Sequence, residues 1–256
     1  MDYTQKIIVA PNTDIDTIEK AINLINTTDP IIYIKKGEYN IYSLVSMSKK
    51  DINITYIGDF KDTIIYINNP ASGTNFINKT TFKNIRFKCS DTMPAYWNNY
   101  YVMAYFVNNS TEIIFENCIF DKSNNKLKPN WVFIFLCNTT TSYVSNIYFI
   151  NCTFNQESIS DVFSCGHAHF KNCLYNAQYF INGANEDSIC PLDNVIKDDI
   201  DQETFKPLNV PYNSVGAYCN LNYQTVSNTI KNKVKSTILN NKLFEKYCVP
   251  YEEEQL

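Results

Sequence analysis

One six-residue pattern recurs along the chain and constrains its fold more than any other feature. The pattern is an aromatic residue, any residue, Asn, a small apolar residue, any residue, and a second aromatic residue. Three close copies and one looser, earlier copy are present: Phe115–Phe120, Phe149–Phe154, Phe170–Tyr175 and, as the looser one, Phe82–Phe87. Successive copies start 33, 34 and 21 residues apart. Such self-similarity is the sequence signature of a repeat architecture.

Within each copy the side chains alternate between inward and outward positions, which is the two-residue period of a β-strand rather than the period of a helix. Stacked copies would lie about 4.8 Å apart as paired strands and would form three inward columns. Two columns are aromatic, and the third holds small apolar residues: Ile85, Cys118, Cys152 and Cys173. The Asn residues would stack at a bend, because Asn tolerates a left-handed backbone and its amide can donate to the next Asn. This arrangement predicts an all-β solenoid, a parallel β-helix.

Composition excludes several classes of function. The net charge of -4 is spread over both signs, so the chain lacks the basic footprint of a nucleic-acid-binding protein. No apolar run approaches the roughly 20 residues of a membrane helix, and residues 1–6 do not resemble a signal peptide. The nine cysteines form no Cys-x-x-Cys pair. We therefore expect reduced thiols, cytoplasmic folding and no cofactor.

The N-terminal region mixes short strands with one helix. Apolar spacing predicts an amphipathic helix over about 14–26, with Asp14 or Asp16 as its N-cap. Its apolar face consists of Ile15, Ile18, Ala21, Ile22 and Ile25. Strands are expected over four ranges: 6–10, 31–34, 52–58 and 63–67.

The order of these elements resembles the opening of the pectin-lyase-like right-handed β-helix proteins. The matching motifs are Ile-x-Ile-x-x-Gly-x-Tyr from Ile32 to Tyr39, Ile54-x-Tyr56-x-Gly58, and Thr63-Ile64-Ile65. That superfamily includes pectinesterases, polysaccharide lyases and many phage tail spikes. The resemblance covers roughly residues 14–183. It implies a right-handed β-helix capped by the N-terminal helix and, as in many tail spikes, a homotrimer.

Two domains are predicted. The first is the β-helix with its cap, over 1–183. The second, over 184–256, begins with a Pro-containing extended segment at 184–223 and continues with an amphipathic helix over about 225–247. That helix either closes the last coil or docks on a partner protein.

Some outward positions of the repeat are unusually apolar. They are Ile114, Ile119, Tyr148, Ile150 and Leu174. An apolar patch on the flank of a solenoid is usually covered. Two alternatives remain for what covers this patch: the segment 184–223, or the same face of another subunit.

The family's catalytic motifs are missing from their expected places. A pectate lyase requires an acidic calcium cluster beside a basic residue, and Lys83 and Arg86 have no acidic neighbours of that kind in the repeat. The alternative candidates for a catalytic acid are Asp121, Glu157 and Asp161, which follow one corner of successive coils. Cys165, His167 and His169 are weak candidates for a metal site, because three ligands so close on one strand fit tetrahedral geometry badly.

The aromatic loops are the stronger functional signal. Tyr96, Trp97 and Tyr100 lie in the insertion after the first copy, and Trp131 lies in the insertion after the second. Exposed rings beside polar groups suit stacking on sugars. The alternative is that these rings pack their own loops onto the coil.

These features favour a non-enzymatic virion or appendage protein, of a phage tail or capsid surface, that binds host-surface glycan. Its partners would be other virion proteins, with no membrane involved, and its location would be the virion or the extracellular space. The first alternative is a polysaccharide lyase or glycoside hydrolase of the same fold. A cellular β-helix adhesin is the second.

Overall fold

The computed structural model describes eleven ranges of the chain: residues 4–69, 78–92, 101–102, 105–106, 112–121, 131–132, 136–137, 146–164, 168–182, 192–211 and 215–217. The predicted helix over 225–247 lies outside these ranges. The proposed division at residue 183 therefore stays a prediction.

A large parallel sheet dominates the described structure. Its eleven strands are β1 (Lys6–Val9), β2 (Ile31–Ile34), β3 (Gly37–Ile41), β4 (Ile54–Ile67), β5 (Thr80–Cys89), β8 (Glu112–Glu116), β9 (Ile119–Asp121), β12 (Asn146–Ile150), β13 (Thr153–Ser164), β14 (His169–Asn182) and β15 (Leu192–Lys197). Two further parallel pairs join β6 (Tyr101–Val102) to β10 (Trp131–Val132) and β7 (Tyr105–Phe106) to β11 (Leu136–Cys137). The fold is therefore mainly β, as predicted.

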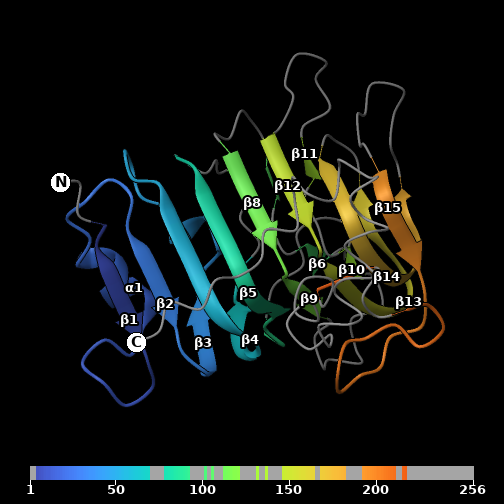
Figure 1. Ribbon diagram of the computed structural model, residues 1–256, viewed down its shortest axis with the longest axis horizontal. Helices are drawn as coiled ribbons and strands as arrows, with labels where there is room; N and C mark the ends of the chain where they lie inside the picture. Colours follow the sequence, from blue (N-terminus) through green and yellow to red (C-terminus); the bar gives the residue numbers. More distant parts are fainter. Residues whose placement is uncertain are drawn as a thin grey trace, which may run out of the picture.

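The strands lie side by side, from β1 at one end of the molecule to β15 at the other, and the four copies of the repeat follow one another within this order (Figure 1). The residues before each Asn pair with one another, so Phe82, Phe115, Phe149 and Phe170 follow in register through β5, β8, β12 and β14. The residues after each Asn pair in the same way, from Phe87 to Phe120 to Phe154 to Tyr175. The alignment read from the sequence is confirmed.

The two aromatic columns form the core. Phe115 stacks on Phe82 and on Phe149 with ring centroids 5.0 Å apart in both pairs, and Phe149 continues to Phe170 at 4.9 Å. Tyr56 of β4 extends this column by stacking on Phe82 at 5.3 Å. Rings of the second column meet the first edge-on, which is a favoured aromatic geometry.

The column of cysteine side chains is as fully buried as the aromatic columns. Cys118, Cys152 and Cys173 are fully buried and carry free thiols. Burial raises the pKa of the Cys118 thiol to about 12, because a thiolate loses its hydration there. These cysteines therefore act as small core-filling residues.

The Asn residues turn the chain as predicted. Each has a left-handed backbone: Asn84, Asn117, Asn151 and Asn172 have φ between 51° and 56°. The Asn172 side chain donates to the amide oxygen of Asn151 at 3.2 Å, and that of Asn194 donates to Asn172 at 3.0 Å. Asn194, at φ 56°, belongs to β15, so the stack continues into a strand that has no aromatic residue at either end of the motif.

The N-terminal helix is shorter than predicted. Helix α1 spans Ile18–Asn23, and Ile18 and Ala21 face the core as expected. The prediction of Asp14 or Asp16 as N-cap is wrong, because the Thr17 hydroxyl accepts the N–H of Lys20 at 3.2 Å. Asp16 instead forms an ion pair with the Lys20 side chain at 2.6 Å. In the described ranges no helix has the length and apolar character to cross a membrane.

Candidate functional site

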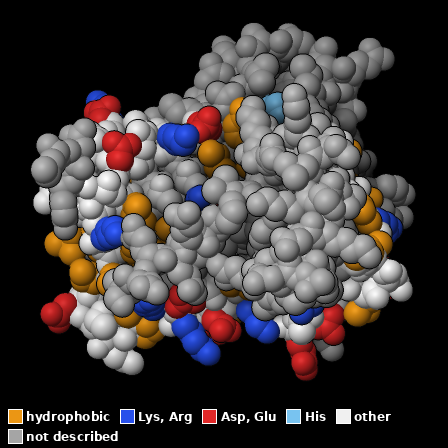
Figure 2. Space-filling model, in the orientation of Figure 1, with side chains coloured by type: hydrophobic (Ala, Val, Ile, Leu, Met, Phe, Trp, Pro, Cys, Tyr) orange, Lys and Arg blue, Asp and Glu red, His pale blue; other side chains and the backbone are white. Residues whose placement is uncertain are grey.

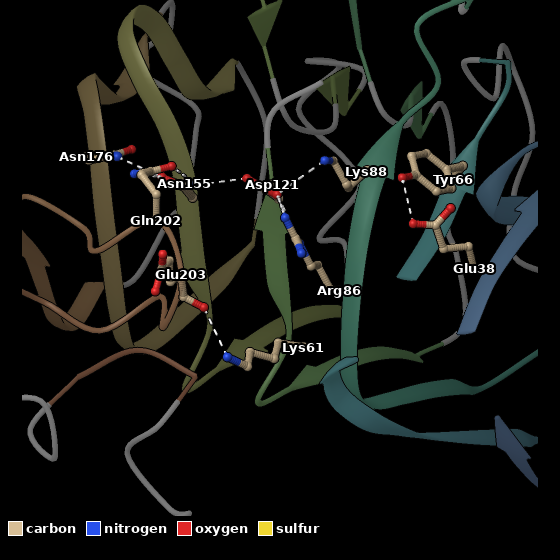
Figure 3. Close-up of polar contacts among 10 residues, drawn as sticks. All are labelled: Glu38, Lys61, Tyr66, Arg86, Lys88, Asp121, Asn155, Asn176, Gln202 and Glu203. Atoms are coloured by element: carbon tan, nitrogen blue, oxygen red, sulfur yellow. Dashed lines mark hydrogen bonds and ion pairs between the residues drawn. The ribbon is translucent and has the colours of Figure 1, made fainter. Parts of the chain in front are cut away.

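The site lies on the flank formed by the outward side chains that follow each Asn. We call it the Asp121 flank. Its members come from four strands, β5, β9, β13 and β14: Arg86, Lys88, Ile119, Asp121, Thr153, Asn155, Leu174 and Asn176. The register places Lys88 opposite Asp121 and Asp121 opposite Asn155. Polar residues far apart in sequence thus form one row (Figure 3).

A hairpin-like loop covers this flank. We call residues 198–211 the strap. Ile200 and Pro207 form an antiparallel bridge within it, and the N–H of Asp201 donates to the carbonyl of Lys206 at 2.9 Å. The N–H of Phe205 donates back to the carbonyl of Asp201 at 2.8 Å, so the tip is a closed turn.

The strap buries the apolar part of the flank. Ile119 and Leu174 are completely buried, although they point away from the main core. They form a separate apolar cluster with Ile200 and Phe205 of the strap and with Val215 and Ala217. The first of the two predicted covers, the segment 184–223, is therefore confirmed for Ile119 and Leu174. Ile114, Tyr148 and Ile150 belong to β8 and β12, before the Asn of each copy, and are half-buried.

Asp121 is at the centre of the polar row and is only 3% exposed. One of its carboxylate oxygens accepts both the Nε of Arg86, at 3.0 Å, and an Nη of the same guanidinium. The Nζ of Lys88 lies 3.7 Å from that oxygen. Lys83 likewise pairs with a single acid of the adjacent copy, Glu116, at 2.8 Å. Both pairs join adjacent copies, and their residues are more than thirty positions apart in sequence.

Asn155 connects Asp121 to the strap. Its amide nitrogen donates to the free oxygen of Asp121 at 2.8 Å and to Gln202 at 3.0 Å. Its amide oxygen accepts from Gln202 at 3.1 Å and from Asn176 at 2.9 Å. Asn155 is 1% exposed and uses its full hydrogen-bonding capacity. It is therefore the point at which the sheet and the strap are joined.

Three further contacts hold the strap and its continuation. The Arg86 guanidinium lies 4.6 Å from the ring centroid of Phe205, which suits a cation–π contact. The Nζ of Lys61 in β4 donates to the carbonyl of Glu203 at 3.1 Å (Figure 3). Beyond the strap, the N–H of Ala217 donates to the Thr153 hydroxyl at 2.9 Å.

The base of the strap is closed by a carboxylate. Asp198 accepts the side chain of Asn209 at 2.7 Å and the N–H groups of Asn209 and Val210 at 2.8 and 2.9 Å. Burial by itself would raise the pKa of Asp198, but these hydrogen bonds outweigh it and leave the pKa lowered. The pKa of Asp201 is lowered by hydrogen bonds from the Thr204 side chain and backbone.

This arrangement fastens one segment to another and is poorly suited to proton transfer. Both oxygens of Asp121 are occupied by donors, and Arg86 and Lys88 lie beside one of them. A general acid or base instead needs an oxygen within hydrogen-bond reach of the substrate. Figure 2 shows acidic and basic side chains intermingled on the coloured part of the surface, as expected from the mixed composition.

Most of the other predicted site residues lie outside the described ranges. These are Tyr96, Trp97, Tyr100, Cys165 and His167, together with the side chains of Trp131, Glu157 and Asp161. The backbone of Trp131 pairs with that of Tyr101, so the segments that follow the first and second copies do meet. His169 stacks on Tyr148 with centroids 4.8 Å apart, and burial lowers its pKa. Among the described residues no group of His, Cys, Asp and Glu could hold a metal ion.

Sequence reasoning missed Asn155 and Gln202. A signal existed for Asn155, because it directly follows the second aromatic residue of its copy, as Asp121 does. Equivalent positions in adjacent copies become neighbours once the copies stack. Gln202 carries no comparable signal, since it belongs to a segment outside the repeat.

Comparisons with known proteins add little to this geometry. No protein-family model matches the sequence, and a search of the curated proteins found no match. Among solved structures, ORF18 of Geobacillus virus E2 aligns with 75% of this chain and 60% of its own, at 16% identity and a TM-score of 0.26. This chain therefore spans less than two thirds of that protein's length. A likeness at this TM-score carries no argument about fold or function.

Proposed function

We propose that this chain is a right-handed parallel β-helix that serves as a non-enzymatic structural protein of a virion or appendage. The in-register stacking of four copies supports the solenoid. The environment of Asp121 carries the functional part of the proposal. It is the one predicted catalytic acid whose side chain is described, and its oxygens are committed to Arg86, Lys88 and Asn155.

The flank geometry supports a scaffold. A covering segment, a buried ion pair and a fully bonded amide make the outer wall rigid, and both oxygens of Asp121 already have donors. Rigidity is what a β-helix needs in order to present loops at a fixed spacing. On this proposal the loops with Tyr96, Trp97, Tyr100 and Trp131 bind host-surface glycan, and the assembly is a homotrimer.

Glycan cleavage is the direct test of the non-enzymatic part. The purified protein is incubated with host-surface polysaccharide, and the release of reducing ends and of unsaturated sugars is measured. We expect no release by the native chain. Cleavage that is abolished in Glu157→Gln or Asp161→Asn, at unchanged thermal stability, would establish the enzyme instead.

Asp121→Asn separates the structural role from the catalytic one. It preserves shape and removes the charge that pairs with Arg86 and Lys88. We expect a lower unfolding temperature and unchanged glycan binding. Trp97→Ala and Trp131→Ala should weaken retention on host glycan without changing the unfolding temperature.

The assembly is tested independently. Light scattering on the eluted protein should give three times the chain mass of 29.6 kDa. A monomer at micromolar concentration would refute the trimer and leave the solenoid unaffected.

A further inference from the structure

The strap packs in an apolar cluster of its own, whereas the strands around it contribute to the main core. Its apolar residues pack in their own cluster with Ile119 and Leu174, and this cluster is separate from the continuous core of Phe and Cys columns. Lifting the strap would therefore expose one flank without opening the main core.

The closure of the strap depends on a carboxylate. The two oxygens of Asp198 accept from the Asn209 side chain and from the N–H groups of Asn209, Val210 and Asp199, at distances of 2.7 to 2.9 Å. These contacts join the two ends of the strap, eleven and twelve residues apart in sequence. A second carboxylate, Asp201, holds the tip by accepting the N–H and the hydroxyl of Thr204, each at 2.7 Å. Both carboxylates act only as acceptors in these contacts.

We propose that the strap is an acid-releasable cover: protonation of Asp198, aided by Asp201, opens the hairpin of residues 198–211, so that Gln202 and Phe205 are no longer held in place on the flank, while the sheet stays folded. A protonated carboxyl group replaces one acceptor oxygen with a donor hydroxyl, which faces N–H groups rather than acceptors. The four charge-assisted hydrogen bonds of Asp198 are then lost or weakened together.

The charged groups around the two carboxylates are compatible with this switch. The described hydrogen-bond partners of Asp198 are neutral, and Lys197 and Asp199 flank it in the sequence. Asp201 faces the strap's own Thr204 and, from β4, the cation of Lys61. From β5, Arg86 and Lys88 contact Asp121.

The direction of the pH dependence follows from the lowered pKa values. A carboxyl group whose pKa is lower when the strap is closed stabilises the closed form at pH values above its free pKa. That stabilisation disappears as the pH falls through the closed-state value, which for Asp198 lies below 3.8. The pKa of Asp201 is also lowered, so this carboxylate affects the closed form in the same direction.

Hydrogen exchange measured by mass spectrometry tests the cover. The labelled full-length chain is compared with Asp198→Asn, which keeps the shape and removes the charge, and with the control Asp199→Asn, whose side chain is exposed one residue away. At pH 7 we expect Asp198→Asn to raise exchange in strap peptides by about tenfold or more, since bonds to a charged group are strong. Exchange in β8 and β12 should not change, and Asp199→Asn should match the native chain.

An acid titration of the native chain gives the second readout. Strap exchange, corrected for the intrinsic effect of pH, should rise on acidification before β8 and β12 lose protection, and an apolar dye should bind in the same step, because the lowered pKa of Asp198 keeps the strap closed until the solution is strongly acidic. In Asp198→Asn this step should be smaller, because that carboxyl group no longer titrates. Two results would overturn the proposal: equal exchange in the two variants, or loss of strap protection only together with β8 and β12.

Discussion

Removal of the Asn155 side chain should destabilise the protein strongly, because this amide bonds both to the sheet and to the strap. Asn155→Ala deletes four hydrogen bonds at once. Asp121 is buried and loses the donor to one of its oxygens, and an unsatisfied buried charged acceptor costs about 2–3 kcal/mol. Gln202 and Asn176 reach water and lose less, so the expected total is about 2–4 kcal/mol.

The matched control lies in the same row of the sheet. Asn40 occupies the equivalent register position beyond Tyr66 and Lys88, but its side chain is exposed. Asn40→Ala should change the free energy of unfolding by no more than about 0.5 kcal/mol. Urea unfolding followed by circular dichroism measures both variants. The reasoning fails if Asn155→Ala unfolds at the same urea concentration as Asn40→Ala.

Three further predictions concern the core and the bend. Phe115→Ala should cost about 3–5 kcal/mol in urea unfolding, because the ring is fully buried between Phe82 and Phe149; a loss under 1 kcal/mol would contradict the column. Gly58→Ala should lower the unfolding temperature, because the added Cβ would lie 2.5 Å from the carbonyl oxygen of Asn84; an unchanged temperature would show that the approach is looser. Cys118 should resist alkylation at pH 8 until the chain is denatured, because burial raises its pKa to about 12; rapid labelling of the folded protein would place that thiol at the surface.

The sheet and its core were largely predictable from the sequence. Stacking in a repeat requires only that equivalent residues follow one another, and the Phe, Cys and Asn positions carry that information locally. β15 was missed because Leu192, Val195 and Lys197 preserve the strand but not the aromatic pattern. The N-cap was misassigned because Asp14, Asp16 and Thr17 are all good caps, and only the chain path decides among them.

The candidate site was predictable only in part. Asp121 was identified as an acid at a repeated corner, but the sequence does not show that the register places Lys88 opposite it or that Arg86 reaches it. Its burial depends on the strap, which is distant in sequence and has no periodic pattern. The contacts of Gln202 are tertiary and have no local signature.

The central claim is that the Asp121–Asn155 row fastens the strap to the sheet. A double-mutant cycle between Asn155→Ala and Gln202→Ala tests it most directly, because these two amides exchange a reciprocal pair of hydrogen bonds across the junction. The free energies of unfolding of the native chain, both single variants and the double variant give the coupling between the two side chains. The account predicts a coupling of about 1–2 kcal/mol, as two neutral hydrogen bonds supply. Additive losses, with no coupling, would contradict it.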